Sequence, residues 1–248
     1  MAGSVNASTD AVRDAVRRVT DPELDRSIVD LDYVIECRVE GDHAHLSLRL
    51  PTAWCSPAFA WMMAADARRE ALSVPGVHSA RVELLDHMHA GEITDGVNDD
   101  LEFVEAFAEA EGGLDELRRE LLEKARLARQ YDAVRALRES GMDDADLVSL
   151  TSDDVEFDGD RALVPVDGAV VVCTEREPIE LYLDRAERVG LLERGEPIFR
   201  DHAGEPIRVE EFETVYRRTR LARTNIGGQA AICAGLHESR QATVGRRY

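Results

Sequence analysis

Residues 33–57, YVIECRVEGDHAHLSLRLPTAWCSP, decide the fold of the first part of this chain. Hydrophobic and polar side chains alternate over 33–39 and again over 44–50, which is the period-two pattern of half-buried strands. The Glu-Gly-Asp sequence between them has the composition of a hairpin turn. The stretch therefore predicts an antiparallel strand pair that leads into a loop, and this loop carries Cys55.

The flanking segments complete a small α/β unit. Residues 9–19 place valines at helical spacing behind a Thr/Asp cap, and a second helix is expected over about 58–72. Residues 78–85 alternate as a third strand, after a Val-Pro-Gly-Val sequence that ends the helix. The expected order is helix, strand, strand, helix, strand.

An acidic stretch separates this unit from the rest of the chain. Residues 96–116 hold eight acidic residues and no basic one, which favours a solvated linker with a short acidic helix over a binding segment. Further helices and short strands are expected at 114–139, 146–157, 161–172, 177–189 and 208–223. We therefore expect a mixed α+β protein, with a small α/β domain at 1–95, a linker at 96–116 and a mostly helical α/β region at 117–248.

The composition indicates habitat rather than activity. Fifty acidic residues against 30 basic ones give a net charge of −20, and Lys124 is the single lysine. The acidic residues are spread along the chain, as in halophilic proteins, and a high-GC genome is the alternative cause of the missing lysines. No apolar run reaches the roughly 18 to 20 residues of a membrane helix, and the N-terminus lacks the pattern of a signal peptide. We expect a cytoplasmic protein without a membrane partner.

The four cysteines are widely scattered, so neither a zinc site with CxxC spacing nor a disulfide framework is expected. Cys37 and Cys173 lie on strand patterns and are interpreted as core cysteines. Cys233 lies one helical turn before His237, and this spacing would suit a metal pair, although a packed tail helix is favoured. Cys55 differs from the other three because it lies between a strand and a helix. Backbone N–H groups at a helix N-terminus stabilise a thiolate, the form that binds iron or accepts a persulfide.

The order of four short motifs resembles the PaaD/SufT-like family of metal–sulfur cluster assembly factors. The matching pieces are VTDPEL at 19–24, IVDLDYV at 28–34, LRLPTAWC at 48–55 and VPGV at 74–77. The family usually has glycine where this chain has Asp32, and it often closes the third strand with Pro and Trp where this chain reads Asp-His-Met-His at 86–89. The resemblance covers the N-terminal 90 or so residues.

The resemblance implies an accessory factor in iron–sulfur cluster assembly or delivery, rather than a turnover enzyme. Cys55 would hold iron, a cluster or a persulfide transiently, and the motif residues Asp21, Glu23, Asp30 and Thr52 would shape its surroundings. The partners would be the cluster-assembly machinery or a metalloenzyme client. One cysteine per chain would need a homodimer or a partner to hold a cluster well.

Two histidines follow the third strand and could reach Cys55. His87 and His89 point the same way on an extended segment, because side chains alternate there. Two imidazoles and a thiolate would suit zinc or iron, whereas a pair of surface histidines is the favoured interpretation.

The C-terminal segment 208–248 is locally basic, with eight arginines and four acidic residues. Its centre holds Arg217, Arg218, Arg220 and Arg223. A basic helix can bind phosphate, so a nucleic-acid-binding or regulatory protein is the alternative function. The negative charge of the whole chain would repel DNA, and docking to a protein partner or to the acidic linker is therefore favoured.

Overall fold

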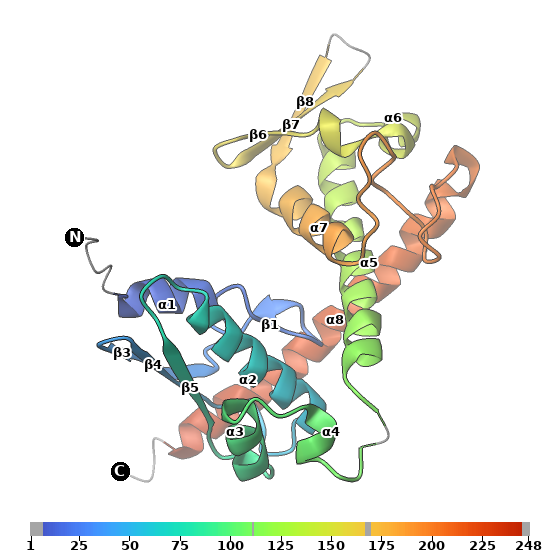
Figure 1. Ribbon diagram of the computed structural model, residues 1–248. Helices are drawn as coiled ribbons and strands as arrows, with labels where there is room; N and C mark the ends of the chain where they lie inside the picture. The colour runs from blue at the N-terminus through green and yellow to red at the C-terminus, as the bar shows by residue number, and fades with distance from the viewer. Residues whose placement is uncertain (1–6, 111, 167–169, 245–248) are drawn as a thin grey trace, which may run out of the picture. The chain divides into compact units, whose positions relative to one another are not determined.

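The computed structural model describes residues 7–110, 112–166 and 170–244. Residue 111 of the acidic segment, residues 167–169 and the last four residues of the basic segment lie outside this description. The described chain divides into two compact units, one built from residues up to 118 together with those from 229 onward, and the other from 119–228. Helices and strands occur in both units, which confirms the mixed α+β class (Figure 1).

A three-stranded sheet organises the first unit. β3 (Val34–Glu40) pairs antiparallel with β4 (His43–Leu48) through a tight turn, in which Gly41 has the positive φ that the turn requires. β4 then pairs in parallel with β5 (Ser79–Leu84), and α2 (Pro57–Leu72) is the crossover between them. Parallel neighbours need such a crossover because the end of the first strand and the start of the second lie at opposite edges of the sheet. The expected strand–strand–helix–strand order is confirmed.

Two helices cover the sheet and enclose the core. α1 (Thr9–Val16) buries its valines against α2 and β3, and Ser8 caps its first turn. The inward side chains of β4 are Ala44, Leu46 and Leu48, all at most 2% exposed. The two-residue strands β1 (Thr20–Asp21) and β2 (Arg26–Ser27) pair with each other in the segment between α1 and β3.

A β-bulge changes which residues of β3 face the core. The pairing register shifts between Val34 and Glu36, and an extra residue at this point reverses the alternation. Tyr33 and Val34 are both buried, whereas Ile35 is 44% exposed. The alternation expected over 33–39, which would place Ile35 on the buried face, is therefore wrong at this residue.

The acidic segment contains helical structure. α3 (Ala90–Asn98) precedes the short α4 (Phe103–Ala106), and Glu102 and Glu105 form a capping box at the start of α4. The rings of Phe103 and Phe107 lie edge-on to Trp61 of α2, with centroids 5.7 and 6.1 Å away. The segment is therefore attached to the first unit by aromatic contacts, while those of its acidic side chains that the structure describes are exposed to solvent.

The second unit has its own core around an antiparallel sheet. Its strands are β6 (Glu156–Asp158), β7 (Arg161–Val166) and β8 (Val170–Glu175), in that order. The helical elements of this part are α5 (Asp115–Glu139), α6 (Asp144–Ser149), the 3-10 turn Ser152–Asp154, α7 (Arg176–Arg188) and α8 (Val209–Val244). α5 begins in the first unit and α8 ends in it. Helix α8 is longer than the expected 208–223.

Candidate functional site

The carboxyl ends of the parallel strands β4 and β5 carry the two loops that form the candidate site. Leu48 and Leu84 are register partners, and the Leu85 N–H donates to the carbonyl of Leu48 at 2.7 Å. The chain then leaves β4 toward Cys55 and leaves β5 toward His87. The two loops are joined further on, where the Met88 N–H donates to the carbonyl of Ala53 at 3.0 Å. Functional side chains often lie at this edge of parallel strands.

Cys55 is half-buried and immediately precedes Ser56, the residue that caps α2. The predicted position beside a helix N-terminus is therefore confirmed. The Thr52 hydroxyl oxygen lies 3.4 Å from the sulfur of Cys55. The same oxygen accepts a hydrogen bond from the Trp54 N–H at 3.2 Å, so its own hydrogen can turn toward the sulfur. The sulfur of Cys55 therefore lies beside a hydroxyl group and close in sequence to the first turn of α2.

The imidazole ring of His87 holds the Cys55 loop in place by binding the backbone carbonyl of Cys55. The ring is 8% exposed, and its Nδ1 accepts a hydrogen bond from the His89 N–H at 3.2 Å. Nε2 therefore carries the proton and donates to the carbonyl oxygen of Cys55 at 2.9 Å. Burial lowers the pKa of His87, which keeps the ring neutral. Both ring nitrogens are used in these hydrogen bonds, so His87 orients the loop rather than facing the sulfur.

His89 lies against different neighbours. Its ring centroid is 5.3 Å from that of Phe107, and its Nδ1 is 3.5 Å from the Glu92 carboxylate. Within the described part of the chain, no three His, Cys, Asp or Glu side chains come together in an arrangement that could hold a metal ion.

The Asp-Pro-Glu segment lies on the other side of the site. Asp21 is 8% exposed, and its Oδ1 accepts hydrogen bonds from the backbone N–H groups of Glu23 and Leu24 at 2.9 and 3.1 Å. Burial raises the pKa of the Asp21 carboxyl, against the effect of these two bonds. Asp30 is elsewhere, in an exposed ion pair with Arg17. The structure thus brings Asp21 and Glu23 toward the site, but not Asp30.

The phenol of Tyr33 interacts electrostatically with ionisable groups of both the Asp-Pro-Glu segment and the Cys55 loop. The Tyr33 side chain is 2% exposed, and its phenol acts to lower the pKa of the Asp21 carboxyl, against the larger effect of burial. Burial raises the pKa of Tyr33, and the negative charges of Asp21, Cys233 and Cys55 raise it further. Two thiols and a carboxylate therefore act on one buried phenol.

Cys233 reaches this site from the C-terminal end of α8. Burial raises the pKa of its thiol to about 11, and the charges of Asp21, Glu23 and Cys55 contribute to the rise. His237, one turn further along α8, is buried with its ring centroid 5.6 Å from that of Tyr33. The sequence showed the Cys233–His237 spacing, but only the tertiary structure shows that this helix face meets the Cys55 loop. Tyr33 was part of a strand pattern and of the IVDLDYV piece at 28–34, but neither pattern assigned it to the site.

The remaining cysteines lie outside this cluster. Cys37 is half-buried on β3, its sulfur is 3.8 Å from the carbonyl oxygen of Thr9, and burial raises its pKa. The expectation of a core position for Cys173 is wrong, because the residue is exposed. Its neighbours Val172 and Thr174 face inward on β8, so strand alternation turns Cys173 to the outside.

Two of the four arginines at the centre of the basic segment form ion pairs with acidic residues of their own unit. Arg223 binds both carboxylate oxygens of Asp132 on α5, at 2.8 and 3.0 Å. Arg217 donates to Glu213 at 3.0 Å, one turn earlier on α8. Arg218 and Arg220 are exposed.

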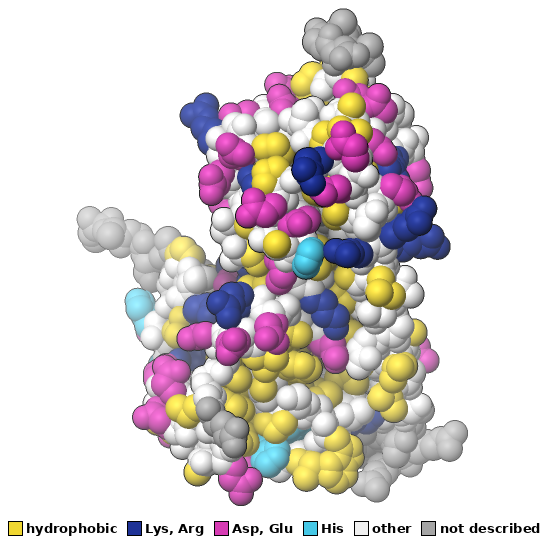
Figure 2. Space-filling view, turned by 90° about the vertical axis from the view of Figure 1, so that its right-hand side faces the viewer, with side chains coloured by type: hydrophobic (Ala, Val, Ile, Leu, Met, Phe, Trp, Pro, Cys, Tyr) yellow, Lys and Arg dark blue, Asp and Glu magenta, His cyan; other side chains and the backbone are white. Residues whose placement is uncertain are grey.

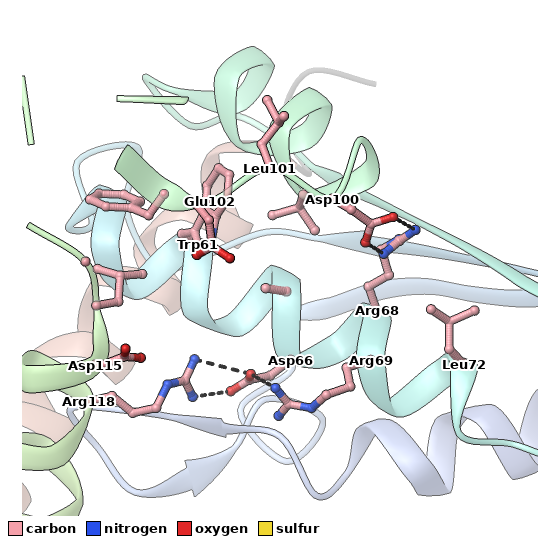
Figure 3. Close-up of a pocket in the computed structure, with 15 residues that line it drawn as sticks. Trp61, Asp66, Arg68, Arg69, Leu72, Asp100, Leu101, Glu102, Asp115 and Arg118 are labelled. Carbon is pink, nitrogen blue, oxygen red and sulfur yellow. Dashed lines mark hydrogen bonds and ion pairs between the residues drawn. The ribbon is translucent and has the colours of Figure 1, made fainter. Parts of the chain in front are cut away.

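A separate hollow of about 510 Å³ lies on the first unit, along α2, α3 and the start of α5 (Figure 3). Asp66 accepts from Arg118 at 2.7 Å and from Arg69 at 2.9 Å. Arg68 is paired in the same way with Asp100, as the dashed lines of Figure 3 show. These arginines are thus neutralised by neighbouring carboxylates, and the hollow does not include Cys55.

Exposed hydrophobic side chains flank the Cys55 loop. Trp54 is 74% exposed and Met88, on the other loop, is 55% exposed. Figure 2 shows hydrophobic side chains gathered over part of the first unit, in the lower half of that view. Large apolar side chains that are exposed together are typical of a surface that binds another protein.

The comparison with protein families agrees with this architecture. Residues 9–84 match the family described as iron-sulfur cluster assembly protein. The match begins at the first residue of α1 and ends at the last residue of β5, so it spans the helix–strand–strand–helix–strand unit and Cys55. It supports a role in iron–sulfur cluster assembly for the matched domain. No curated protein shows a significant match to the chain. Among the helices in the described ranges, none is long and apolar enough to cross a membrane.

Proposed function

We propose that this chain is an accessory factor that receives iron or an iron–sulfur cluster at Cys55 and delivers it to a client protein. It would be a PaaD/SufT-like factor that transfers its cargo without catalytic turnover. The observation that carries the proposal is the position of Cys55. It lies inside the family match, half-buried, between the carboxyl end of β4 and the N-terminus of α2.

The surroundings of Cys55 support transfer to a protein. Half-burial protects a bound ion or cluster from solvent, and the loop position leaves a path for an acceptor thiolate. Trp54 and Met88 supply exposed apolar surface on both loops, next to the sulfur. The partner of this surface would be the assembly machinery or a metalloenzyme client.

The basic segment supports a protein contact better than a nucleic-acid contact. Arg217 and Arg223 are paired with carboxylates, which reduces the positive charge available to phosphate. Arg218 and Arg220 remain exposed on α8 as candidates for docking an acidic partner surface.

The test is anaerobic reconstitution with ferrous iron and sulfide, followed by transfer to an apo-ferredoxin. We expect Cys55→Ser to lower the transferred cluster at least tenfold, because the sulfur ligand is lost. Cys37→Ser is the matched control, since Cys37 is also half-buried in the first unit. Transfer by Cys55→Ser at the wild-type rate would refute the proposed role of this cysteine.

A further inference from the structure

The C-terminal end of α8 contacts the Cys55 site along one helix face. Gln229, Cys233, His237 and Arg240 follow at intervals of four, four and three residues, which keeps them on the same side of a helix. Gln229 donates to the Glu23 carboxylate at 3.3 Å. Arg240 donates to the carbonyl oxygens of Leu50, at 2.7 Å, and of Asp86. Cys233 lies between these anchors and therefore faces the same surface.

These anchors surround Cys55. Glu23 belongs to the Asp-Pro-Glu segment, Leu50 begins the loop that carries Cys55, and Asp86 precedes His87. Both thiols also act electrostatically on the buried phenol of Tyr33. The contacts of Gln229 and Arg240 thus bring the helix face that carries Cys233 to the same part of the first unit as Cys55, although the two cysteines are far apart in the sequence.

Hydrophobic packing does not explain why α8 presents this face to the domain. Ile232 is 60% exposed and Leu236 is 44% exposed, so the aliphatic side chains next to Cys233 and His237 point outward. A helix that docked only to bury apolar surface would turn those residues inward. Instead a thiol, an imidazole, an amide and a guanidinium face the site.

We propose that Cys233 is the second thiol of the Cys55 site, and that the two cysteines together bind a thiophilic divalent cation, with ferrous iron as the cargo. Both thiols give up their protons on binding, so two thiolates offset the charge of the ion. Glu23 accepts a hydrogen bond from Gln229, one helical turn before Cys233, and its negative charge favours a cation near this thiol. The remaining coordination positions are left to sulfide or to ligands of the delivering and receiving proteins. The inference rests on the proposed function and makes one chain able to supply two ligands.

The test is titration of the reduced full-length protein with Co²⁺ alone, under anaerobic conditions. Thiolate ligands give Co²⁺ a charge-transfer absorption band whose intensity grows with the number of sulfur ligands. We expect Cys233→Ser and Cys55→Ser each to lower this intensity by about half and to weaken Co²⁺ binding at least tenfold. The matched controls are Cys37→Ser and Cys173→Ser, which should behave as the wild type. Cys233→Ala repeats the test with a smaller side chain, and circular dichroism verifies folding.

The outcomes separate this inference from the proposed function. A Cys233→Ser protein with the full wild-type band overturns the inference, while a loss in Cys55→Ser alone leaves the proposed function intact. If Cys55→Ser and Cys233→Ser both keep the full Co²⁺ charge-transfer band, the result contradicts the inference and the proposed function alike. A wild-type protein without any thiolate band also overturns the two-thiol site, whatever the result of the cluster-transfer experiment.

Discussion

Arg240 is the strongest measurable link between α8 and the Cys55 site. Its side chain is 18% exposed and binds two backbone carbonyls, those of Leu50 and Asp86. A hydrogen bond from a charged donor stabilises by about 1.5–3 kcal/mol, so Arg240→Ala removes several kcal/mol from the docking of this helix end. Helix ends are held by a small part of the total stability, and we expect the end of α8 to undock in the variant.

The reactivity of Cys233 reports this undocking. When the helix is docked, the pKa of its thiol is raised from an ordinary value of 9.0 to about 11. At pH 8 the thiolate fraction then rises from ~0.1% when docked to ~9% when undocked, roughly a hundredfold change. A less basic thiolate is a weaker nucleophile. With a Brønsted coefficient of about 0.45, the rate constant of the thiolate itself falls roughly eightfold, which offsets part of this gain. The net expectation is labelling by iodoacetamide about tenfold faster at Cys233.

The measurement is the rate of carbamidomethylation at pH 8, read for each cysteine peptide by mass spectrometry. Arg218→Ala is the matched control, because Arg218 is an exposed arginine on the same helix. The exposed Cys173 is the internal standard and should react equally in all three proteins. A change below twofold at Cys233 in Arg240→Ala would refute the argument that Arg240 holds this thiol at the site.

Two further predictions concern the elements that support the site. A Cβ on Gly96 of α3 would lie 2.6 Å from the Trp61 ring, so Gly96→Ala should destabilise by about 1–3 kcal/mol despite a better helix propensity. In the same helix, a Cβ on Gly91 would have no neighbouring atom within 4 Å, so Gly91→Ala should leave the melting temperature unchanged or raise it. Equal shifts of the melting temperature for the two variants would contradict the packing of Gly96 against Trp61. Burial lowers the pKa of His87, so its contribution to stability is complete above its ordinary pKa of 6.5 and is lost as the pH falls through its lowered value. Thermal unfolding at pH 7.5 and 5.5 should show a smaller acid-induced loss in His87→Gln than in the wild type, and an equal loss would disprove the role of the neutral ring that orients Cys55.

The expected division into 1–95, 96–116 and 117–248 stays a prediction about which parts fold separately. The structure attaches Phe103 and Phe107 to Trp61, so aromatic packing occurs within the acidic segment. Residues 229–244 of α8 belong to the first unit, whereas the preceding part of the same helix belongs to the second. Limited proteolysis that yields a stable N-terminal fragment ending near residue 95 would support the expected boundary.

The local structure around Cys55 could be predicted from the order of residues alone. Alternation over 33–39 and 44–50 predicted β3 and β4, and Pro57 was compatible with the first turn of a helix. Asp32, at the position where the resembled family has glycine, has φ of +57°, a conformation that aspartate tolerates better than most residues. These features depend on residues that are neighbours in the sequence, so the order of residue types is sufficient to predict them.

Which distant groups meet at the site depends on the packing of elements that are far apart in the sequence. Cys233 was recognised as a helix residue one turn from His237, but helical spacing says nothing about the surface that the helix meets. The bulge in β3 and the outward position of Cys173 were hidden for the same reason, since inward and outward faces are set by strand register and by the layers that cover the sheet. The Cys55 loop follows from local sequence, whereas its second thiol depends on where the last turns of a long helix pack.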